Sequence, residues 1–287
     1  MNKNITSIVE TQEERAKALA EDAPIRSEES LKAVRKNFNI LLAEDNLINQ
    51  KVSLKILHAS GYNASAVSNG AEAVESIQNE DYDLILMDIQ MPEVDGFSAT
   101  AQIRRLENEK GDVPIIALTA HALMGDREKC LSSGMNEYLS KPIIARDLLA
   151  MIDRLLDLQN VPLEKIPEAK QVDSSLFDFE RLKKVSADDF EFEKDLLSSY
   201  IEDIESKYKQ LEDYVEAKDA ESIIDLAHTI KGASYSVGAQ KVGDEAFGIE
   251  ISGKSRDLIS VEERLPQFKN ALEETKTILS EFLVSAE

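Results

Sequence analysis

The 287-residue chain has a formal net charge of −22 and 43% hydrophobic residues. This acidity disfavours non-specific binding to nucleic acid or insertion at anionic membrane surfaces, because both reward clusters of Lys and Arg. No apolar run reaches the roughly 18–20 residues of a membrane span, and the first residues lack the apolar centre of a signal peptide. The single cysteine, Cys130, excludes an intramolecular disulfide. We therefore expect a cytoplasmic globular protein, long enough for two domains.

Residues 1–37 are rich in charged and small side chains, and we expect a partly helical or flexible lead-in with a helix near residues 13–20. From residue 38, apolar runs alternate with amphipathic stretches. The predicted strands are 39–43, 63–67, 84–88, 115–118 and 137–140, and the predicted helices are 47–60, 70–78, 97–107, 124–132 and 144–156. Five successive strand–helix units within residues 38–156 predict a doubly wound α/β domain with a five-stranded parallel sheet.

The remainder of the chain has a different pattern, without alternating strands and helices. Residues 157–176 contain two prolines and no sustained periodicity, which predicts a linker. Residues 177–287 show helical spacing with charged faces and no strand signal. The main predicted helices are 188–217, 219–237, 239–254 and 261–283. An all-α helical bundle is the natural outcome of this pattern.

Polar side chains follow four of the five predicted strands. The first strand ends in Glu44 and Asp45, the third in Asp88, the fourth in Thr119 and the fifth in Lys141. The carboxyl ends of parallel strands meet at one edge of a sheet, where open α/β proteins bind ligands. Three crowded carboxylates repel one another and are stable mainly around a cation, and hard oxygen ligands suit Mg²⁺.

This arrangement predicts phosphoryl chemistry, with Asp88 as a nucleophile that forms an aspartyl phosphate. Lys141 and Thr119 would hold the oxygens of the phosphoryl group. Each residue alone also has a structural interpretation. Asp88 could cap a turn, Glu44 and Asp45 could cap the next helix, and Lys141 could be a surface lysine. The coincidence at the same position of successive strands favours the chemical interpretation.

The segments Glu44-Asp45-Asn46-x-x-Asn49 and Met87-Asp88-Ile-Gln-Met-Pro92 resemble the acidic opening and phosphoacceptor strand of response-regulator receiver domains, which are flavodoxin-like. The resemblance covers residues 38–156. It implies that Asp88 accepts the phosphoryl group, that Asp45 binds Mg²⁺ directly and Glu44 largely through water, and that the backbone carbonyl of Gln90 completes the metal shell.

Two further segments extend this resemblance. Leu118-Thr119-Ala120 matches the switch hydroxyl position, and Tyr138-Leu-Ser-Lys141-Pro142 matches the switch aromatic and the phosphate-binding lysine. Receivers usually have a cis peptide before that proline. His121, two residues after Thr119, stands where receivers tend to modulate the lifetime of the phosphoryl group, whereas His58 in the first helix is expected to pack or lie on the surface.

On the predicted helix 219–237, His228 lies opposite the apolar stripe and should be exposed. A solvated surface histidine is the simplest interpretation. Gly232 within the helix costs about 1 kcal/mol against alanine, which indicates that something approaches closely there. Lys231, three residues after the histidine, could steady a phosphoryl group. No second His or Cys stands at ligand spacing, which disfavours zinc.

The stretch Ala227-His228-Thr-Ile-Lys231-Gly232-Ala-Ser-Tyr-Ser-Val-Gly238-Ala239 resembles the phosphoacceptor helix of histidine-containing phosphotransfer (HPt) domains. The resemblance implies that His228 is the phosphohistidine site, that Lys231 supports the phosphate, and that Gly232 leaves room for a docking receiver. A receiver followed by an HPt domain is the arrangement found in the C-terminal part of hybrid sensor histidine kinases.

We therefore expect a phosphorelay intermediate that exchanges a phosphoryl group between Asp88 and His228, or with a histidine kinase and downstream receiver or HPt proteins. The chain lacks nucleotide-binding boxes and a basic DNA-reading helix, so a stand-alone kinase is not expected. One alternative is a non-catalytic docking module with a receiver-like surface. Another is a Mg²⁺-dependent phosphohydrolase, although such an enzyme would usually carry an acid where this chain has Gln90.

Overall fold

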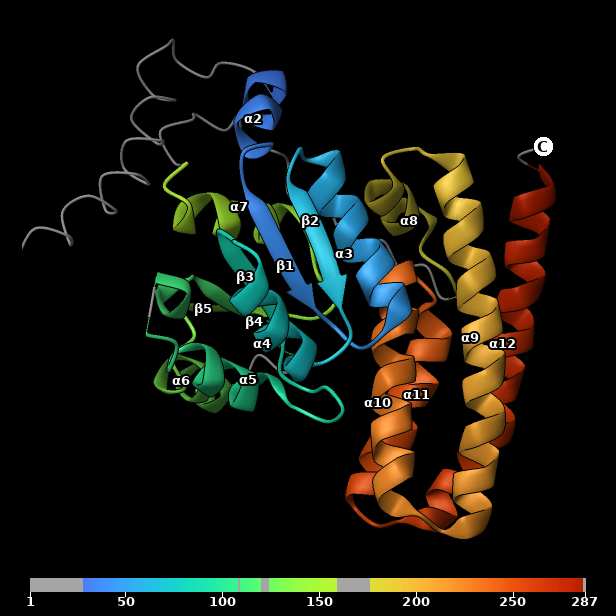
Figure 1. The fold of residues 1–287 in the computed structure, drawn as a ribbon. Helices are drawn as coiled ribbons and strands as arrows, with labels where there is room; N and C mark the ends of the chain where they lie inside the picture. Colours follow the sequence, from blue (N-terminus) through green and yellow to red (C-terminus); the bar gives the residue numbers. More distant parts are fainter. Residues whose placement is uncertain (1–27, 108, 120–123, 159–175, 286–287) are drawn as a thin grey trace, which may run out of the picture.

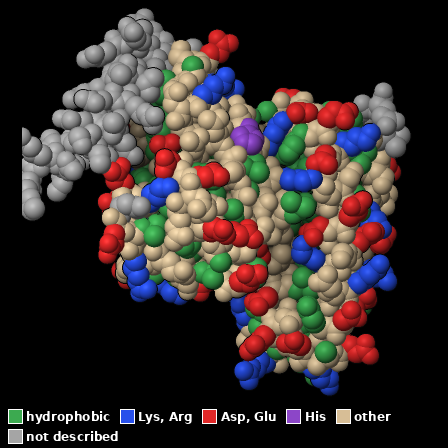
Figure 2. Space-filling view, in the orientation of Figure 1, with side chains coloured by type: hydrophobic (Ala, Val, Ile, Leu, Met, Phe, Trp, Pro, Cys, Tyr) green, Lys and Arg blue, Asp and Glu red, His purple; other side chains and the backbone are tan. Residues whose placement is uncertain are grey.

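An α/β unit lies beside a bundle of long helices in the computed structural model of the chain (Figure 1). The structure describes residues 28–107, 109–119, 124–158 and 176–285. The predicted helix near residues 13–20, His121 and all but the ends of the predicted linker lie outside these ranges. Acidic side chains are spread over both units rather than gathered on one of them (Figure 2).

The α/β unit is built on a five-stranded sheet in which every neighbouring pair is parallel. The strands are β1 Asn39–Ala43, β2 Asn63–Val67, β3 Leu84–Asp88, β4 Ile115–Thr119 and β5 Glu137–Ser140. Their order is β2-β1-β3-β4-β5. The predicted doubly wound parallel sheet is confirmed, and β4 extends one residue further than predicted, to Thr119.

Burial explains why these segments form strands. Every side chain of β3 and β4 is buried, as expected for central strands of a sheet that is covered on both faces. Alternate residues such as Leu42 and Leu86 join a core with α3 and α7, whereas Leu41 and Ile85 join a core with α4, α5 and α6. These helices are α3 Leu47–Ala59, α4 Gly70–Asn79, α5 Gly96–Ile103, α6 Met124–Ser132 and α7 Ala145–Leu155. A 3₁₀ turn, η1 Glu109–Asp112, precedes β4.

Helix α2 Glu28–Arg35 lies in the segment that was expected to be partly helical or flexible, outside the stretch near residues 13–20, and it packs against the α/β unit. Its Leu31 side chain is buried, and the helix closely approaches the turn at Gly61. Gly61 has φ +97°, and a Cβ there would lie 2.7 Å from the carbonyl oxygen of Lys32. Only glycine satisfies both the left-handed backbone and this close approach.

Arg35, at the end of α2, forms a buried ion pair with Asp153 of α7. The two side chains meet at 2.6 Å between Nη2 and Oδ2 and at 3.1 Å between Nε and Oδ1. Tyr62 donates a hydrogen bond to the same carboxylate. Burial and the adjacent Asp153 raise the pKa of Tyr62 above its usual range, so its hydroxyl stays protonated as the donor. This network fixes α2 to α7, which is the last helix of the α/β unit.

The second unit is a bundle whose helices are α8 Phe179–Ser186, α9 Phe190–Ala217, α10 Ala220–Val237, α11 Gln240–Lys254 and α12 Leu258–Ser285. The predicted bundle is confirmed, and α8 is a helix that the sequence analysis missed. Asp178, Asp189 and Asp219 accept backbone N–H groups at the starts of α8, α9 and α10. These caps satisfy orphan donors and explain why the helices begin there. Among the described residues, no helix is long and apolar enough to cross a membrane.

The Arg35–Asp153 pair gives a test of this architecture. Substitution of Arg35 by Met leaves Asp153 as a buried carboxylate without its cation. We expect the free energy of unfolding of the α/β unit to fall by about 3–5 kcal/mol. Hydrogen exchange of the β1 amides as a function of urea concentration measures this unit alone. The control is Arg154→Met, which breaks the more exposed pair with Glu137 on the same unit and should change the value by less than about 1 kcal/mol. Equal losses of unfolding free energy in both variants would contradict a special role of the buried Arg35–Asp153 pair.

Candidate functional site

Three carboxylates meet at the carboxyl edge of the sheet. Ala43 of β1 pairs in register with Met87 of β3, so the residues that follow each of them become neighbours. Oxygen atoms of Glu44, Asp45 and Asp88 all lie within 4.8 Å of one another. The sheet topology thus brings together the three acids that the sequence analysis placed at this edge.

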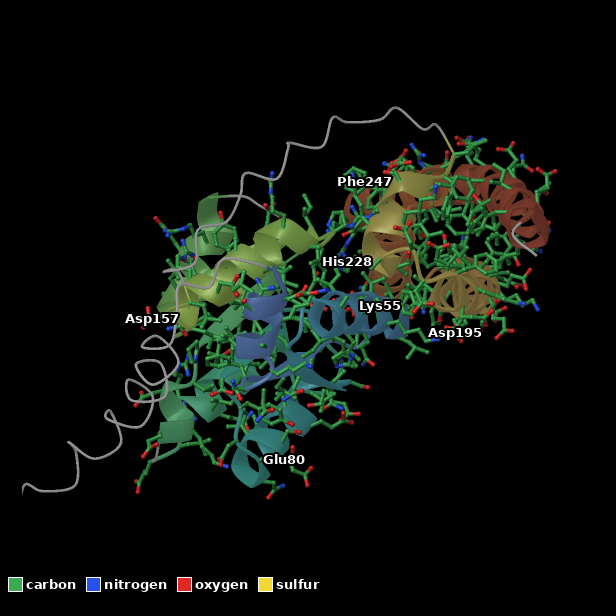
Figure 3. The ribbon with its side chains drawn as sticks, turned by 90° about the horizontal axis from the view of Figure 1, so that it is seen from above. Lys55, Glu80, Asp157, Asp195, His228 and Phe247 are labelled. Atoms are coloured by element: carbon green, nitrogen blue, oxygen red, sulfur yellow. The ribbon has the colours of Figure 1, made fainter. Side chains whose placement is uncertain are left out.

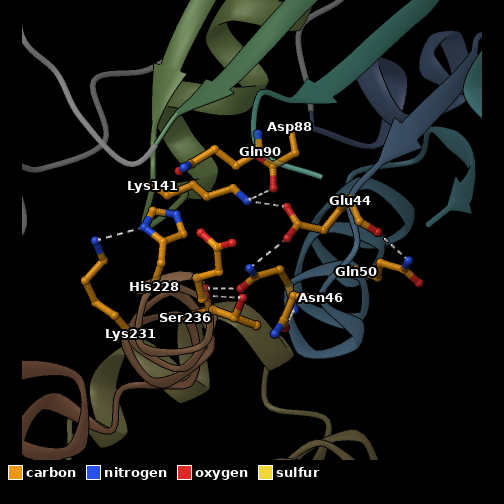
Figure 4. A network of polar contacts seen from close by, with 12 residues as sticks. Glu44, Asn46, Gln50, Asp88, Gln90, Lys141, His228, Lys231 and Ser236 are labelled. Atoms are coloured by element: carbon orange, nitrogen blue, oxygen red, sulfur yellow. Dashed lines mark hydrogen bonds and ion pairs between the residues drawn. The ribbon is translucent and has the colours of Figure 1, made fainter. Parts of the chain in front are cut away.

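Lys141 is the cation of this cluster (Figure 4). Its Nζ lies 2.6 Å from Oε2 of Glu44 and 2.6 Å from Oδ2 of Asp88. Its backbone N–H donates to the carbonyl oxygen of Thr119 at 2.6 Å, which positions the lysine beside the end of β4. The peptide bond from Lys141 to Pro142 is cis, as the resemblance implied. The lysine predicted to bind phosphate therefore lies directly against the predicted phosphoacceptor.

The electrostatics of the cluster show one positive charge among three acids. Burial, assisted by Glu44 and Asp45, raises the pKa of Asp88 to about 7 against the opposing effect of Lys141. Burial and the charge of Glu44 also raise the pKa of Asp45. For Lys141, burial would lower the pKa, but Glu44 and Asp88 outweigh it and raise the value above its usual range. The negative charge of the three acids thus exceeds the positive charge of Lys141, and further positive charge would stabilise the ionised forms of the acids.

The donor set fits a hard divalent cation. It consists of carboxylate oxygens of Glu44, Asp45 and Asp88, which is the ligand type that Mg²⁺ prefers. Gln90 lies beside them, and its backbone N–H donates to Oδ1 of Asp88 at 3.2 Å. The predicted role of its carbonyl oxygen in the metal shell stays a prediction.

The two predicted switch residues lie on the neighbouring strands β4 and β5. Thr119 ends β4, one residue beyond the register partner of Asp88, and its side chain is buried. Tyr138 is half-buried on β5, opposite Ala117, and packs against the core on the α4 and α5 side of the sheet. The structure places both residues next to the acidic edge, while their switch role stays a prediction.

His228 of α10 opens into the same cleft as these acids. The cleft has a volume of about 870 Å³ and is lined from both units, with Asp88 and Lys141 on one side and His228 and Phe247 on the other. The expectation that His228 is exposed is wrong, because its side chain is only 19% exposed. The helical wheel of α10 correctly put it opposite the apolar stripe, but α11 and the α/β unit lie over that face.

Glu250 of α11 is the functional residue that the sequence analysis missed. Its carboxylate is 1% exposed and lies 3.1 Å from Nδ1 of His228. It also lies 2.6 Å from Nζ of Lys231 and 2.6 Å from Nζ of Lys254. Burial alone would raise the pKa of Glu250, but the hydrogen bonds from His228, Lys231 and Lys254 hold it well below its usual range. One signal in the sequence could have indicated Glu250. It is an acid at the edge of the apolar stripe of α11, and a buried acid needs positively charged or hydrogen-bonding partners.

This carboxylate fixes the state of the histidine. Glu250 can only accept, so it favours the tautomer in which Nδ1 of His228 carries the proton and Nε2 keeps the free lone pair. Nζ of Lys231 is 3.4 Å from Nδ1 (Figure 4), further than its contact with Glu250. Lys231 thus contacts Glu250 more closely than His228, and its predicted role in supporting the phosphoryl group stays a prediction.

Gly232 faces the α/β unit, as the docking prediction requires. A Cβ at this position would lie 3.5 Å from Nδ2 of Asn49, which is an ordinary van der Waals contact. A methyl group would therefore fit against Asn49, and only larger side chains would push the two units apart.

Comparison with known proteins matches both units. Residues 40–153 match the family model described as response regulator receiver domain, and residues 195–278 match the one described as Hpt domain. Hybrid signal transduction histidine kinase B of Dictyostelium discoideum is 49% identical over 120 residues, which are 38% of this chain and 6% of the relative. Sensor histidine kinase GacS of Pseudomonas protegens is 31% identical over 209 residues, which are 71% of this chain and 23% of the relative.

Among solved structures, the receiver domain of a sensor histidine kinase from Pseudomonas aeruginosa is 48% identical, with a TM-score of 0.40. The match covers 42% of this chain and 98% of that one, whose structure has a magnesium ion coordinated in the active site cleft. The chain itself spans less than a quarter of either curated relative's length. With both family models matched in this order, the chain contains a response regulator receiver domain followed by an HPt domain.

Proposed function

We propose that Asp88 and His228 are the two phosphoacceptors of this chain and that a phosphoryl group passes between them. The observation that supports this most strongly is that both side chains open into one cleft, each with its own positioned counter-charge. Lys141 contacts Asp88, and Glu250 contacts His228. A docking module would need neither pair.

The receiver half of the reaction uses Asp88 as a nucleophile. A carboxylate oxygen attacks phosphorus, the bond from phosphorus to the donor breaks, and an acyl phosphate forms. Lys141, which faces the Oδ2 atom, neutralises charge on the phosphoryl oxygens, and Thr119 supplies a hydroxyl at the same edge. Asp45, Glu44, Asp88 and the carbonyl of Gln90 would hold Mg²⁺. The ion would supply the positive charge that phosphoryl transfer requires.

The HPt half uses the Nε2 lone pair of His228. Nε2 attacks the phosphorus of the acyl phosphate, the bond from phosphorus to the Asp88 oxygen breaks, and the Asp88 carboxylate is regenerated. The proton on Nδ1 stays in place, so the phosphorylated ring is cationic and Glu250 stabilises it from 3.1 Å. The same steps run backwards for transfer from His228 to Asp88.

The partners follow from this chemistry. We propose a histidine kinase as the source of the phosphoryl group and a downstream receiver or HPt protein as its destination. Cytoplasmic placement is part of the proposal. So are the domain limits 38–156 and 177–287, which are joined by a linker at 157–176. Thr119 and Tyr138, on adjacent strands, are the proposed switch that such a partner would read.

Labelling with a small phosphodonor such as acetyl phosphate tests the two acceptors. Asp88→Asn should abolish labelling of the whole chain. His228→Gln should retain alkali-labile acyl phosphate and lose the alkali-stable phosphohistidine. His58→Gln, in the first receiver helix, is the matched control and should label as the unaltered protein does. Unchanged labelling in Asp88→Asn and His228→Gln would contradict the proposal.

Magnesium binding is measured by isothermal titration calorimetry. Asp45→Asn removes a charged ligand, and we expect the affinity for Mg²⁺ to fall at least tenfold, equivalent to about 1.4 kcal/mol. Asp95→Asn is the control, because Asp95 lies in the same cleft and caps α5 through a side-chain oxygen that Asn retains. Its affinity should stay within about twofold of the unaltered protein. Equal losses would mean that the cleft's general acidity, rather than Asp45, binds the ion.

Glu250→Gln tests the positioning of His228. The variant keeps the shape but weakens a charge-assisted hydrogen bond, so transfer from Asp88 to His228 should slow about tenfold. Imidazole ¹⁵N spectra should show a smaller share of the Nδ1–H tautomer, with His228→Gln identifying the signal. Glu245→Gln, five residues earlier on α11 and paired with Arg264 instead, is the control and should leave both readouts unchanged. A slower transfer without a tautomer change would assign Glu250 a structural role only.

A further inference from the structure

The receiver helix α3 packs against the HPt bundle along much of the length of α3 (Figures 1 and 3). Buried side chains of the sheet face under α3 and those of the bundle form one continuous apolar cluster, and half-buried Leu54 of α3 packs against it. Three polar side chains of α3 make specific contacts across this boundary, and we call them the α3 docking residues: Asn49, Lys51 and Lys55.

Lys51 and Lys55, one turn apart, pair with acids on α9. Nζ of Lys51 lies 2.6 Å from Oδ2 of Asp195 and 2.8 Å from Oγ of Ser199. Nζ of Lys55 lies 2.6 Å from Oδ2 of Asp189. Lys55 also lies over the ring of Phe192, 4.7 Å from its centroid. Both lysines are thus placed on the bundle in a chain that is otherwise strongly acidic.

Asn49 connects the boundary to the acidic cluster. Its Oδ1 accepts from Oγ of Ser236 on α10 at 2.7 Å, and its Nδ2 donates to Oε1 of Glu44 at 2.9 Å. Glu44 in turn contacts Lys141, which contacts Asp88. One unbroken series of polar contacts therefore runs from the HPt helix to the proposed phosphoacceptor.

Arg181 of α8 makes a further contact between the two units. Its guanidinium donates to the carbonyl oxygen of Ile143 in the receiver at 3.2 Å and to that of Ser236 in the bundle at 3.3 Å. Burial lowers the pKa of Arg181 below its usual range. The two units are therefore joined by polar contacts from α3 and from α8, which meet at Ser236 of α10, as well as by apolar packing.

We infer that the α3 docking residues select the HPt domain of the same chain, so that transfer between Asp88 and His228 occurs within one molecule. This inference rests on the proposed function and adds the partner to it. Partly exposed ion pairs contribute little affinity but fix register and exclude wrongly charged partners. The covalent connection between the two domains supplies the rest, because tethering raises their effective concentration relative to each other.

The docked state has a regulatory consequence. Ser236 and Lys231 are buried, and His228 is mostly covered. A receiver from another protein reaches His228 only after α3 has left the bundle. Docking within the chain and transfer to a second protein thus compete for one surface.

Carbodiimide coupling tests the contacts without any phosphoryl chemistry, because it joins only amines and carboxylates in direct contact. The intact chain is mixed in equal parts as ¹⁴N and ¹⁵N protein, coupled, digested and analysed by mass spectrometry. We expect coupled peptide pairs that join Lys51 to Asp195 and Lys55 to Asp189, with both peptides of each pair carrying the same nitrogen isotope. Lys241–Glu274, a pair at 2.6 Å within the bundle, is the positive control. Mixed-isotope peptides, or none while the control couples, would overturn the inference and leave the assignment of Asp88 and His228 untouched.

A charge swap then tests selection. Lys51→Glu should leave labelling of Asp88 by acetyl phosphate unchanged and slow transfer to His228 several-fold. The double variant Lys51→Glu with Asp195→Lys should restore it. Asp195 is used because Asp189 also caps α9. Lys241→Glu is the matched control on the bundle. Unchanged transfer in Lys51→Glu, or failure of the swap to restore it, would contradict selection by this pair.

Discussion

The site depends on one ammonium group shared by two buried carboxylates. Lys141 lies 2.6 Å from both Glu44 and Asp88, and the pKa of Asp88 is nevertheless raised to about 7. One lysine does not balance three acids, of which Glu44 and Asp88 are buried. Further positive charge would therefore stabilise the cluster, and the register of the parallel strands holds these side chains together at the carboxyl edge of the sheet.

Much of this was predictable from the sequence. Leu84–Asp88 is a short, wholly apolar run that ends in an acid, and burial on both faces is the physical reason for that composition. Because parallel strands share one carboxyl edge, the position of Glu44, Asp88 and Lys141 along the chain sufficed to bring them together. In α10 the stripe of Ile223, Ile230 and Val237 likewise fixed the face on which His228 lies.

Contacts between elements were not predictable in the same way. His228 was expected in solvent because a helical wheel describes one helix and not what covers it. Glu250 reaches the imidazole from the next helix, 22 residues along the chain, and Asn49 reaches Ser236 across 187 residues. Helix α8 was missed because its eight residues are too short for a clear period, and it forms by packing on the bundle.

The amide of Asn49 has a consequence for the surfaces that can dock against α3. An amide offers one acceptor end and one donor end, and here both are used, toward Ser236 and Glu44 respectively. The side chain fits only one way round, and an aspartate of the same shape would turn an acceptor toward the Glu44 carboxylate. A domain that docks here must therefore offer a donor where Oγ of Ser236 lies, because the donor end of the amide is already used by Glu44. Two surfaces of equal shape and charge are thus distinguished by the direction of a single hydrogen bond.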